Sequence, residues 1–206
     1  MDRASSWIER QLRSRGIRDE RVLEAMARVP RERFVPAGQV ARAYEDAALP
    51  LAQGQTISQP YVVALTCELL ALRGEERVLD VGTGSGYAAA VLAELATEVV
   101  SIERIPELAA QAAAALQDAG YGRVELRVGD GTLGVPDRSP FGGIAVAAAG
   151  RDVPKALWEQ LRVGGRIVLP LGVGEEQWLV ALERTASGQR LHAAAPVRFV
   201  PLVGGG

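Results

Sequence analysis

The stretch VLDVGTGSGY, residues 78–87, decides the fold class of this 206-residue chain. A short apolar run is followed by glycines at positions 82, 84 and 86, and then by an alanine-rich segment. Glycine allows a positive φ and lets a ligand approach the backbone closely. We therefore predict a strand, a tight glycine turn and a helix over residues 86–96. The partial positive charge of the helix N-terminus would lie beside the turn.

Two common nucleotide-binding loops do not match this turn. The dinucleotide fingerprint needs a glycine at its sixth position, where this chain has Tyr87. A Walker loop needs a lysine, and the only lysine, Lys155, lies far along the chain. The remaining spacing, with Asp80 two residues before Gly82, resembles motif I of class I S-adenosylmethionine (AdoMet) methyltransferases. AdoMet carries an ammonium and a sulfonium group, so a nearby carboxylate suits it. A purely structural turn is the alternative.

The chain after residue 77 alternates between strand and helix patterns, which predicts a doubly wound, mostly parallel α/β sheet. The early strand candidates are short apolar runs, typical of a parallel sheet covered on both faces. Further helices are expected at residues 106–119 and 154–162. The last two strands follow one another without a helix, so we expect an antiparallel edge. In order, the strand candidates are RVLDVG, EVVSIE, VELRVGD, GGIAVAAA, GRIVLPLG, QWLVALER and APVRFVPL.

Residues 1–60 are expected to form N-terminal helices and a lid segment, and residues 61–206 a Rossmann-like domain. Apolar residues recur at helical spacing early in the chain, and Asp19 suits the N-cap of a second helix. The stretch that follows is irregular until Pro60, which suits the first position of another helix. We predict that the two parts form a single compact unit.

Three acids follow successive predicted strands. Asp80 precedes the glycine turn, Glu103 ends the second strand, and Asp130 with Gly131 ends the third. Open α/β sheets bind ligands at the carboxyl ends of their strands. An acid at the end of the second strand is where a ribose diol is bound, and a carboxylate at the third can accept from an adenine amino group.

Composition argues against several function classes. A net charge of −2 and a pI of about 5.6 give no global basic character for binding nucleic acid. The single cysteine, Cys67, allows neither an intrachain disulfide nor a zinc cluster, and we expect it in the core. No apolar run approaches the ~20 residues that span a membrane. The charged N-terminus does not resemble a signal peptide. We expect a cytoplasmic monomer with no metal, nucleic acid or membrane partner.

Taken together, the motifs resemble those of the protein-L-isoaspartate (D-aspartate) O-methyltransferase family. The resemblance covers roughly residues 20–202, and GQTISQP at 54–60 is its most diagnostic part, because generic AdoMet enzymes lack it. The matching stretches are RERFVP at 31–36, AYEDAALPL at 43–51, GQTISQP at 54–60, RVLDVGTGSGYAAAVLAEL at 77–95, EVVSIER at 98–104, VGDGTLG at 128–134, GGRIVLPLG at 164–172 and RFVPL at 198–202.

The resemblance implies methyl transfer from AdoMet to the free carboxylate of L-isoaspartyl residues in damaged proteins and peptides, which leaves S-adenosyl-L-homocysteine. The ester then collapses to a succinimide, which reopens partly to normal aspartate. Ser58 matches the family's active-site serine. The residues implied to bind the cofactor are Gln55, Thr56, Ile57, Asp80, Gly82, Thr83, Gly84, Ser85, Glu103, Arg104, Asp130 and Gly131.

The chemistry of these residues agrees with methyl transfer to a carboxylate. An α-carboxyl group has a pKa of about 3.5, so the nucleophile is already an anion at neutral pH and no general base is required. A neutral hydroxyl such as that of Ser58 is sufficient to orient it. The only histidine, His192, is expected to be structural or exposed. Residues 43–60 should lie as a lid over the cofactor, with Gly54 permitting a bend.

The chain departs from the family pattern in one notable place. Gly142 stands where the family usually has an aspartate before its fourth strand. We expect this glycine to cost about 1 kcal/mol of stability and not to abolish activity. The loop AAAGRDVP at 147–154 is also looser than usual.

Three other functions are weighed against this one. Relatives that methylate an aspartate in a ribosomally made peptide commonly carry an extra C-terminal domain, which we do not expect because the chain stops at residue 206. The second alternative is an RNA or small-molecule methyltransferase. Methylation of a base would require a basic patch and an aromatic cluster. A non-catalytic AdoMet-binding module is the third, and the presence of Ser58, Glu103 and Asp130 argues against it.

Overall fold

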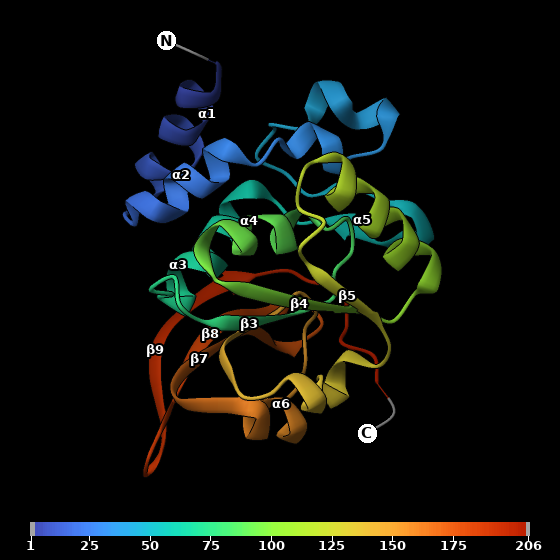
Figure 1. Cartoon of the computed structure of the whole chain (residues 1–206). Coiled ribbons are helices and arrows are strands. Elements are labelled where there is room, and N and C mark those ends of the chain that lie inside the picture. Colours follow the sequence, from blue (N-terminus) through green and yellow to red (C-terminus); the bar gives the residue numbers. More distant parts are fainter. Residues whose placement is uncertain (1–2, 205–206) are drawn as a thin grey trace.

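A seven-stranded sheet in the order β5-β4-β3-β6-β7-β8-β9 forms the centre of the molecule (Figure 1). The computed structural model describes residues 3–204. The strands from β5 to β7 run parallel, and β8 and β9 add an antiparallel edge, which confirms the predicted sheet. The strands are β3 (Arg77–Val81), β4 (Glu98–Glu103), β5 (Glu125–Val128), β6 (Phe141–Val146), β7 (Leu161–Val173), β8 (Glu176–Thr185) and β9 (Gly188–Val197).

Helices cover both faces of the sheet. In Figure 1, α4 and α5 lie on one face and α6 on the other, and α2 packs on the outside of α4. The α-helices are α1 (Arg3–Gln11), α2 (Glu20–Arg28), α3 (Pro60–Leu70), α4 (Tyr87–Leu95), α5 (Pro106–Asp118) and α6 (Lys155–Gln160). Short 3-10 helices are η1 (Arg13–Arg15), η2 (Arg31–Phe34), η3 (Ala37–Arg42), η4 (Ala52–Gly54), η5 (Gly131–Leu133) and η6 (Pro136–Arg138).

Helices α2 and α3 begin at the residues that the sequence predicted. The Asp19 side chain caps α2 by accepting from the Arg21 N–H at 2.9 Å. Pro60 occupies the first turn of α3, as predicted. Cys67 is buried in α3, also as predicted.

The C-terminal strands differ from the prediction. β9 begins earlier than expected, at Gly188, and it ends at Val197. Residues 198–202 were predicted to continue the strand. They leave the sheet instead and run beside the loop that follows β6, where Ala149 donates to Val200 and accepts from Leu202, both at 2.8 Å. This departure creates one wall of the cleft described below.

Gly142 makes room for a neighbouring acid. A Cβ atom at position 142 would lie 2.5 Å from Cγ of Glu76. The Glu76 carboxylate is buried, accepts N–H bonds from residues 73–75, and lies 3.4 Å from Arg162. Position 142 must therefore be glycine while Glu76 occupies this site. Packing against Glu76 therefore explains why glycine stands at position 142, where the sequence analysis had expected only a loss of stability.

Introducing the family's usual acid at this position should therefore destabilise the protein. We expect Gly142→Asp to lower the free energy of unfolding by about 1–3 kcal/mol, because it overpacks the strand and places a second carboxylate beside Glu76. Urea unfolding would measure the loss, and Gly142→Asp should cost less when it is introduced into a Glu76→Ser protein than into the original one. Gly38→Asp, at a position with open space around it, is the control. A Gly142→Asp protein as stable as this control would refute the packing explanation.

Candidate active site

A cleft of about 1030 Å³ opens at the carboxyl ends of β3 and β4. The sheet order reverses between β3 and β6, and ligands bind at such switch points in α/β sheets. Several separate parts of the chain line the cleft, among them residues 54–59 of the lid, the loop after β3, the loop after β4, and residues 195–203. The cleft therefore brings together the lid and the strand ends that the sequence analysis singled out, and adds a C-terminal segment that it had predicted as a strand.

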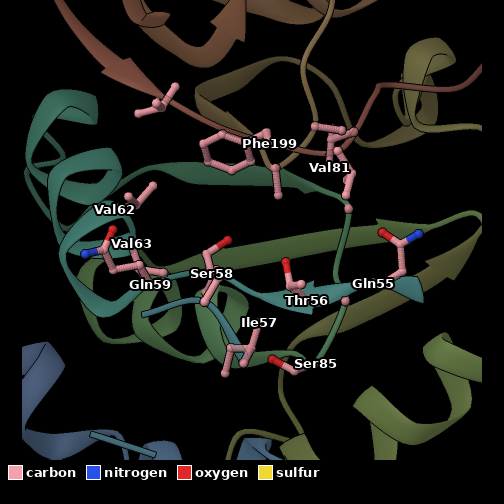
Figure 2. Close-up of a pocket in the computed structure, with 18 of the residues that line it drawn as sticks. Gln55, Thr56, Ile57, Ser58, Gln59, Val62, Val63, Val81, Ser85 and Phe199 are labelled. Atoms are coloured by element: carbon pink, nitrogen blue, oxygen red, sulfur yellow. The ribbon is translucent and has the colours of Figure 1, made fainter. Parts of the chain in front are cut away.

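The lid enters the cleft as a small hairpin. Strands β1 (Leu49–Pro50) and β2 (Thr56–Ile57) pair antiparallel, and Gly54 takes a φ of +67° in the turn between them, as the predicted bend requires. Side chains alternate along β2, so Ile57 is 3% exposed and packs in the core. In Figure 2, the Thr56 and Ser58 hydroxyls point toward the side of the cleft that holds Phe199, and Ile57 points away.

The residue after Ser58 takes part in a set of contacts that reaches the N-terminal layer. The Gln59 side chain donates to the Asp46 carbonyl at 3.0 Å, and the Asp46 carboxylate forms an ion pair with Arg15 of η1. The Arg15 guanidinium also lies 3.7 Å from the centre of the Tyr61 ring. These contacts fasten the lid to the N-terminal layer beside the cleft.

The glycine turn has the predicted backbone. Gly82, Gly84 and Gly86 have φ values of +91°, +54° and +88°, and residues 82–85 line the cleft. The carboxylate of Glu103, which is 6% exposed, locks the turn in place. One of its oxygens accepts from the Gly84 N–H at 2.9 Å, and the other from the Ile105 N–H at 3.1 Å. Each oxygen keeps a lone pair for a further donor.

Asp80 lies beneath the turn and does not line the cleft. It is 2% exposed and accepts from the Ser101 hydroxyl at 2.7 Å. The Ser101 oxygen in turn lies 2.5 Å from the Thr83 hydroxyl. Burial raises the pKa of Asp80 to about 7; the Ser101 hydrogen bond opposes this rise, and the negative charge of Glu103 adds to it. Asp80 thus supports the turn from below.

This raised pKa predicts a specific pH dependence of stability. The unfolded chain releases the Asp80 proton near pH 3.8 and the folded protein near pH 7. The group's stabilising contribution is therefore complete below pH 3.8 and is lost as the pH rises through 7. Asp80→Asn can still accept from Ser101 and has no proton to lose. From pH 5 to pH 8, urea unfolding should show the stability difference shifting in favour of the variant. Parallel stability curves would contradict the assignment.

The third acid sits at the start of η5. Asp130 accepts from the N–H and the hydroxyl of Thr132, at 2.9 and 2.7 Å. Its neighbour Gly131 lines the cleft, where a Cβ atom would lie 2.5 Å from Val81. Glycine is thus needed for close packing at this edge. The carboxyl end of β5 therefore contributes Gly131 to the cleft, whereas the preceding Asp130 is not among the lining residues.

The sequence analysis missed the C-terminal wall. Phe199 and its neighbours face the lid across the cleft (Figure 2), whereas RFVPL had been assigned to a strand. Arg15 and Tyr61 at the rim were also missed. Arg104 does line the cleft, as predicted for a site residue. The ionisable lining side chains include arginines 15, 104 and 198 and Glu103. Two of these arginines are paired with acids outside the lining, Arg15 with Asp46 and Arg198 with Glu175.

Several groups lie away from the cleft. His192 is on β9 beside Glu183, with 2.5 Å between Nε2 and the carboxylate, and is not among the lining residues. Within residues 3–204, no cluster of histidine, cysteine, aspartate or glutamate could hold a metal ion. In the same part of the chain, no helix is long and apolar enough to cross a membrane.

Comparison with known proteins points to one family. Residues 3–206 match the family described as protein-L-isoaspartate(D-aspartate) O-methyltransferase. A protein-L-isoaspartate O-methyltransferase 2 of Anaeromyxobacter sp. (strain Fw109-5) is 59% identical over 97% of this chain and 82% of its own length. A protein of the same name from Marinobacter nauticus is 57% identical, over 97% of this chain and 92% of its own length.

Solved structures share the fold. A protein-L-isoaspartate O-methyltransferase superposes with a TM-score of 0.85 at 27% identity, over 98% of this chain and 66% of the other. A Plasmodium falciparum protein, described as a putative protein-L-isoaspartate O-methyltransferase in complex with S-adenosyl-L-homocysteine, gives a TM-score of 0.84 at 22% identity. The second likeness bears on the fold alone. Together they confirm the predicted methyltransferase fold.

Proposed function

The chain belongs to the protein-L-isoaspartate(D-aspartate) O-methyltransferase family, and from this membership we propose how its residues carry out the reaction. It is an AdoMet-dependent enzyme that methylates the free carboxylate of L-isoaspartyl residues in damaged proteins and peptides and so initiates their repair through a succinimide. The observation that supports the residue roles best is the placement of Ser58 in the same cleft as the glycine turn and Glu103.

The strand ends fit the cofactor. The Glu103 carboxylate retains lone pairs that can accept from the two hydroxyls of a ribose. The turn of residues 82–85 offers a close backbone approach, and the surface at Gly131 suits a flat base, with Asp130 as acceptor for its amino group. On the opposite side we assign Gln55, Thr56 and the main chain of Ile57 to the cofactor. Arg104 borders it, and Asp80 acts indirectly through the turn.

Ser58 orients the substrate. Its hydroxyl donates to one oxygen of the isoaspartyl carboxylate and leaves the other oxygen free to attack. The carboxylate is already ionised at neutral pH, so no residue has to remove a proton. AdoMet supplies a methyl group on a positively charged sulfur and thus brings its own leaving group. The main task of the protein is alignment, which can contribute about 7–11 kcal/mol.

Matched peptides test the activity directly. Radiolabelled AdoMet should transfer base-labile label to a peptide that contains isoaspartate, and not to the same peptide with aspartate or asparagine. Equal labelling of all three peptides, or of none, would contradict the proposed substrate.

The assembly is a further part of the proposal. Residues 1–60 and 61–206 form one unit, and support comes from a hydrophobic core that both share, with Leu12 and Met26 in the same cluster as Leu92. We propose that this unit acts as a monomer in the cytoplasm, without nucleic acid, in keeping with a net charge of −2. Light scattering on the purified protein would measure its mass in solution.

A further inference from the structure

The buried side chain of Gln177 on β8 holds the main chain of the cleft wall that faces Ser58. Gln177 is 7% exposed. Its Nε2 donates to the carbonyls of Gly174 and Phe199, at 2.9 and 3.2 Å, and its Oε1 accepts from the Phe199 N–H at 2.6 Å. One amide therefore binds both polar main-chain groups of Phe199.

Phe199 lies where the chain has already left the sheet. β9 ends at Val197, and the next backbone anchor is Ala149, which bonds to Val200 and Leu202. Arg198 is mostly exposed and pairs with the exposed Glu175. In the part of the chain that the structure describes, Gln177 is thus the side chain that fixes the main chain of the wall at its turning point.

A glutamine is well suited to this task. A residue outside regular secondary structure needs an acceptor for its N–H and a donor for its carbonyl, and a primary amide supplies both groups in one plane. Because Gln177 itself is 7% exposed, its amide has little contact with water that could compete for these bonds. The Phe199 ring and the adjoining backbone are thereby held at a set position across the cleft from Thr56 and Ser58 (Figure 2).

We propose that Gln177 is a positioning residue for the peptide substrate. It fixes the wall at Phe199, and the wall and Ser58 together hold the damaged segment in place. This inference rests on the proposed function only in assigning the space between Phe199 and Ser58 to the substrate. The cofactor side of the cleft, at Glu103 and the glycine turn, is held by other bonds and does not depend on Gln177.

The chain contains a matched control for this role. Gln160 is also buried, at 8% exposed, and also binds main chain with both ends of its amide. It accepts from Val135 at 2.8 Å and donates to Leu133 at 2.9 Å. Neither of those residues lines the cleft. Gln160 therefore reports the general effect of losing such an amide.

The test compares Gln177→Met with Gln160→Met. Methionine fills similar space without the hydrogen bonds. We expect Gln177→Met to raise KM for an isoaspartyl peptide about tenfold or more, with Kd for S-adenosyl-L-homocysteine within about threefold of the original enzyme. Gln160→Met should leave the peptide KM within about threefold. In hydrogen exchange, residues 198–202 should exchange faster in Gln177→Met alone.

Three results would overturn the inference. Unchanged exchange at residues 198–202 in Gln177→Met would show that the amide does not hold the wall. Faster exchange with an unchanged peptide KM, or an equal rise of KM in both variants, would show that the wall does not position the substrate. If the original enzyme itself failed to methylate isoaspartyl peptides, the proposed function would fall, and the exchange result would still decide whether Gln177 fixes the wall.

Discussion

Replacing Ser58 by alanine is expected to lower kcat about 10- to 100-fold, because the carboxylate loses the hydrogen bond that points its free oxygen at the methyl group. The affinity for S-adenosyl-L-homocysteine should stay nearly unchanged, since the cofactor is held mainly at the strand ends. Steady-state kinetics with an isoaspartyl peptide at saturating AdoMet would measure the loss, and calorimetry would measure the affinity.

The control for Ser58→Ala is the same substitution at a serine outside the cleft. Ser187 is exposed in the turn between β8 and β9, and Ser187→Ala should keep the original kcat. Unchanged turnover in Ser58→Ala would remove the orienting role of its hydroxyl. A fall in turnover accompanied by an equal fall in cofactor affinity would move Ser58 from the substrate to the cofactor.

Replacing Glu103 by alanine should mainly weaken cofactor binding. Two hydrogen bonds to a charged acceptor contribute about 1.5–3 kcal/mol each, so we expect at least a 100-fold rise in Kd for S-adenosyl-L-homocysteine. The variant also leaves the partly buried N–H of Gly84 without its acceptor. Titration calorimetry would measure Kd, and kcat at saturating AdoMet should fall much less.

Glu107 gives the matched control for Glu103. It lies in the first turn of α5, close to the end of β4 in the chain, and its side chain is exposed and outside the cleft lining. Glu107→Ala should bind S-adenosyl-L-homocysteine like the original enzyme. If Glu103→Ala also bound it normally, the ribose assignment would be wrong.

The fold could be predicted where it depends on residues that are neighbours in the sequence. The run before Asp80 and the three glycines after it predicted a strand, a turn and a helix, and the positive φ values follow. The mostly parallel sheet follows from the alternation of strands and helices, and the antiparallel edge follows from the missing helix after β7. These features depend on neighbouring residues, whose chemistry is visible in one stretch of sequence.

The missed features depend on residues far apart in the chain. Phe199 faces the lid across the cleft only because the C-terminal segment leaves the sheet after β9 and is held by Gln177 and Ala149. Gly142 is explained only by the side chain of Glu76, which reaches it from the preceding loop. No periodicity marks such contacts, since each joins one side chain to the backbone of a distant segment.

The most direct measurement is a crystal structure of the enzyme with S-adenosyl-L-homocysteine and an isoaspartyl peptide. We predict that Ser58 Oγ lies within about 3.2 Å of the free carboxylate, a hydrogen-bonding distance, with the other carboxylate oxygen facing the sulfur. A carboxylate held by other groups, with the serine hydroxyl out of reach, would contradict the role given to Ser58.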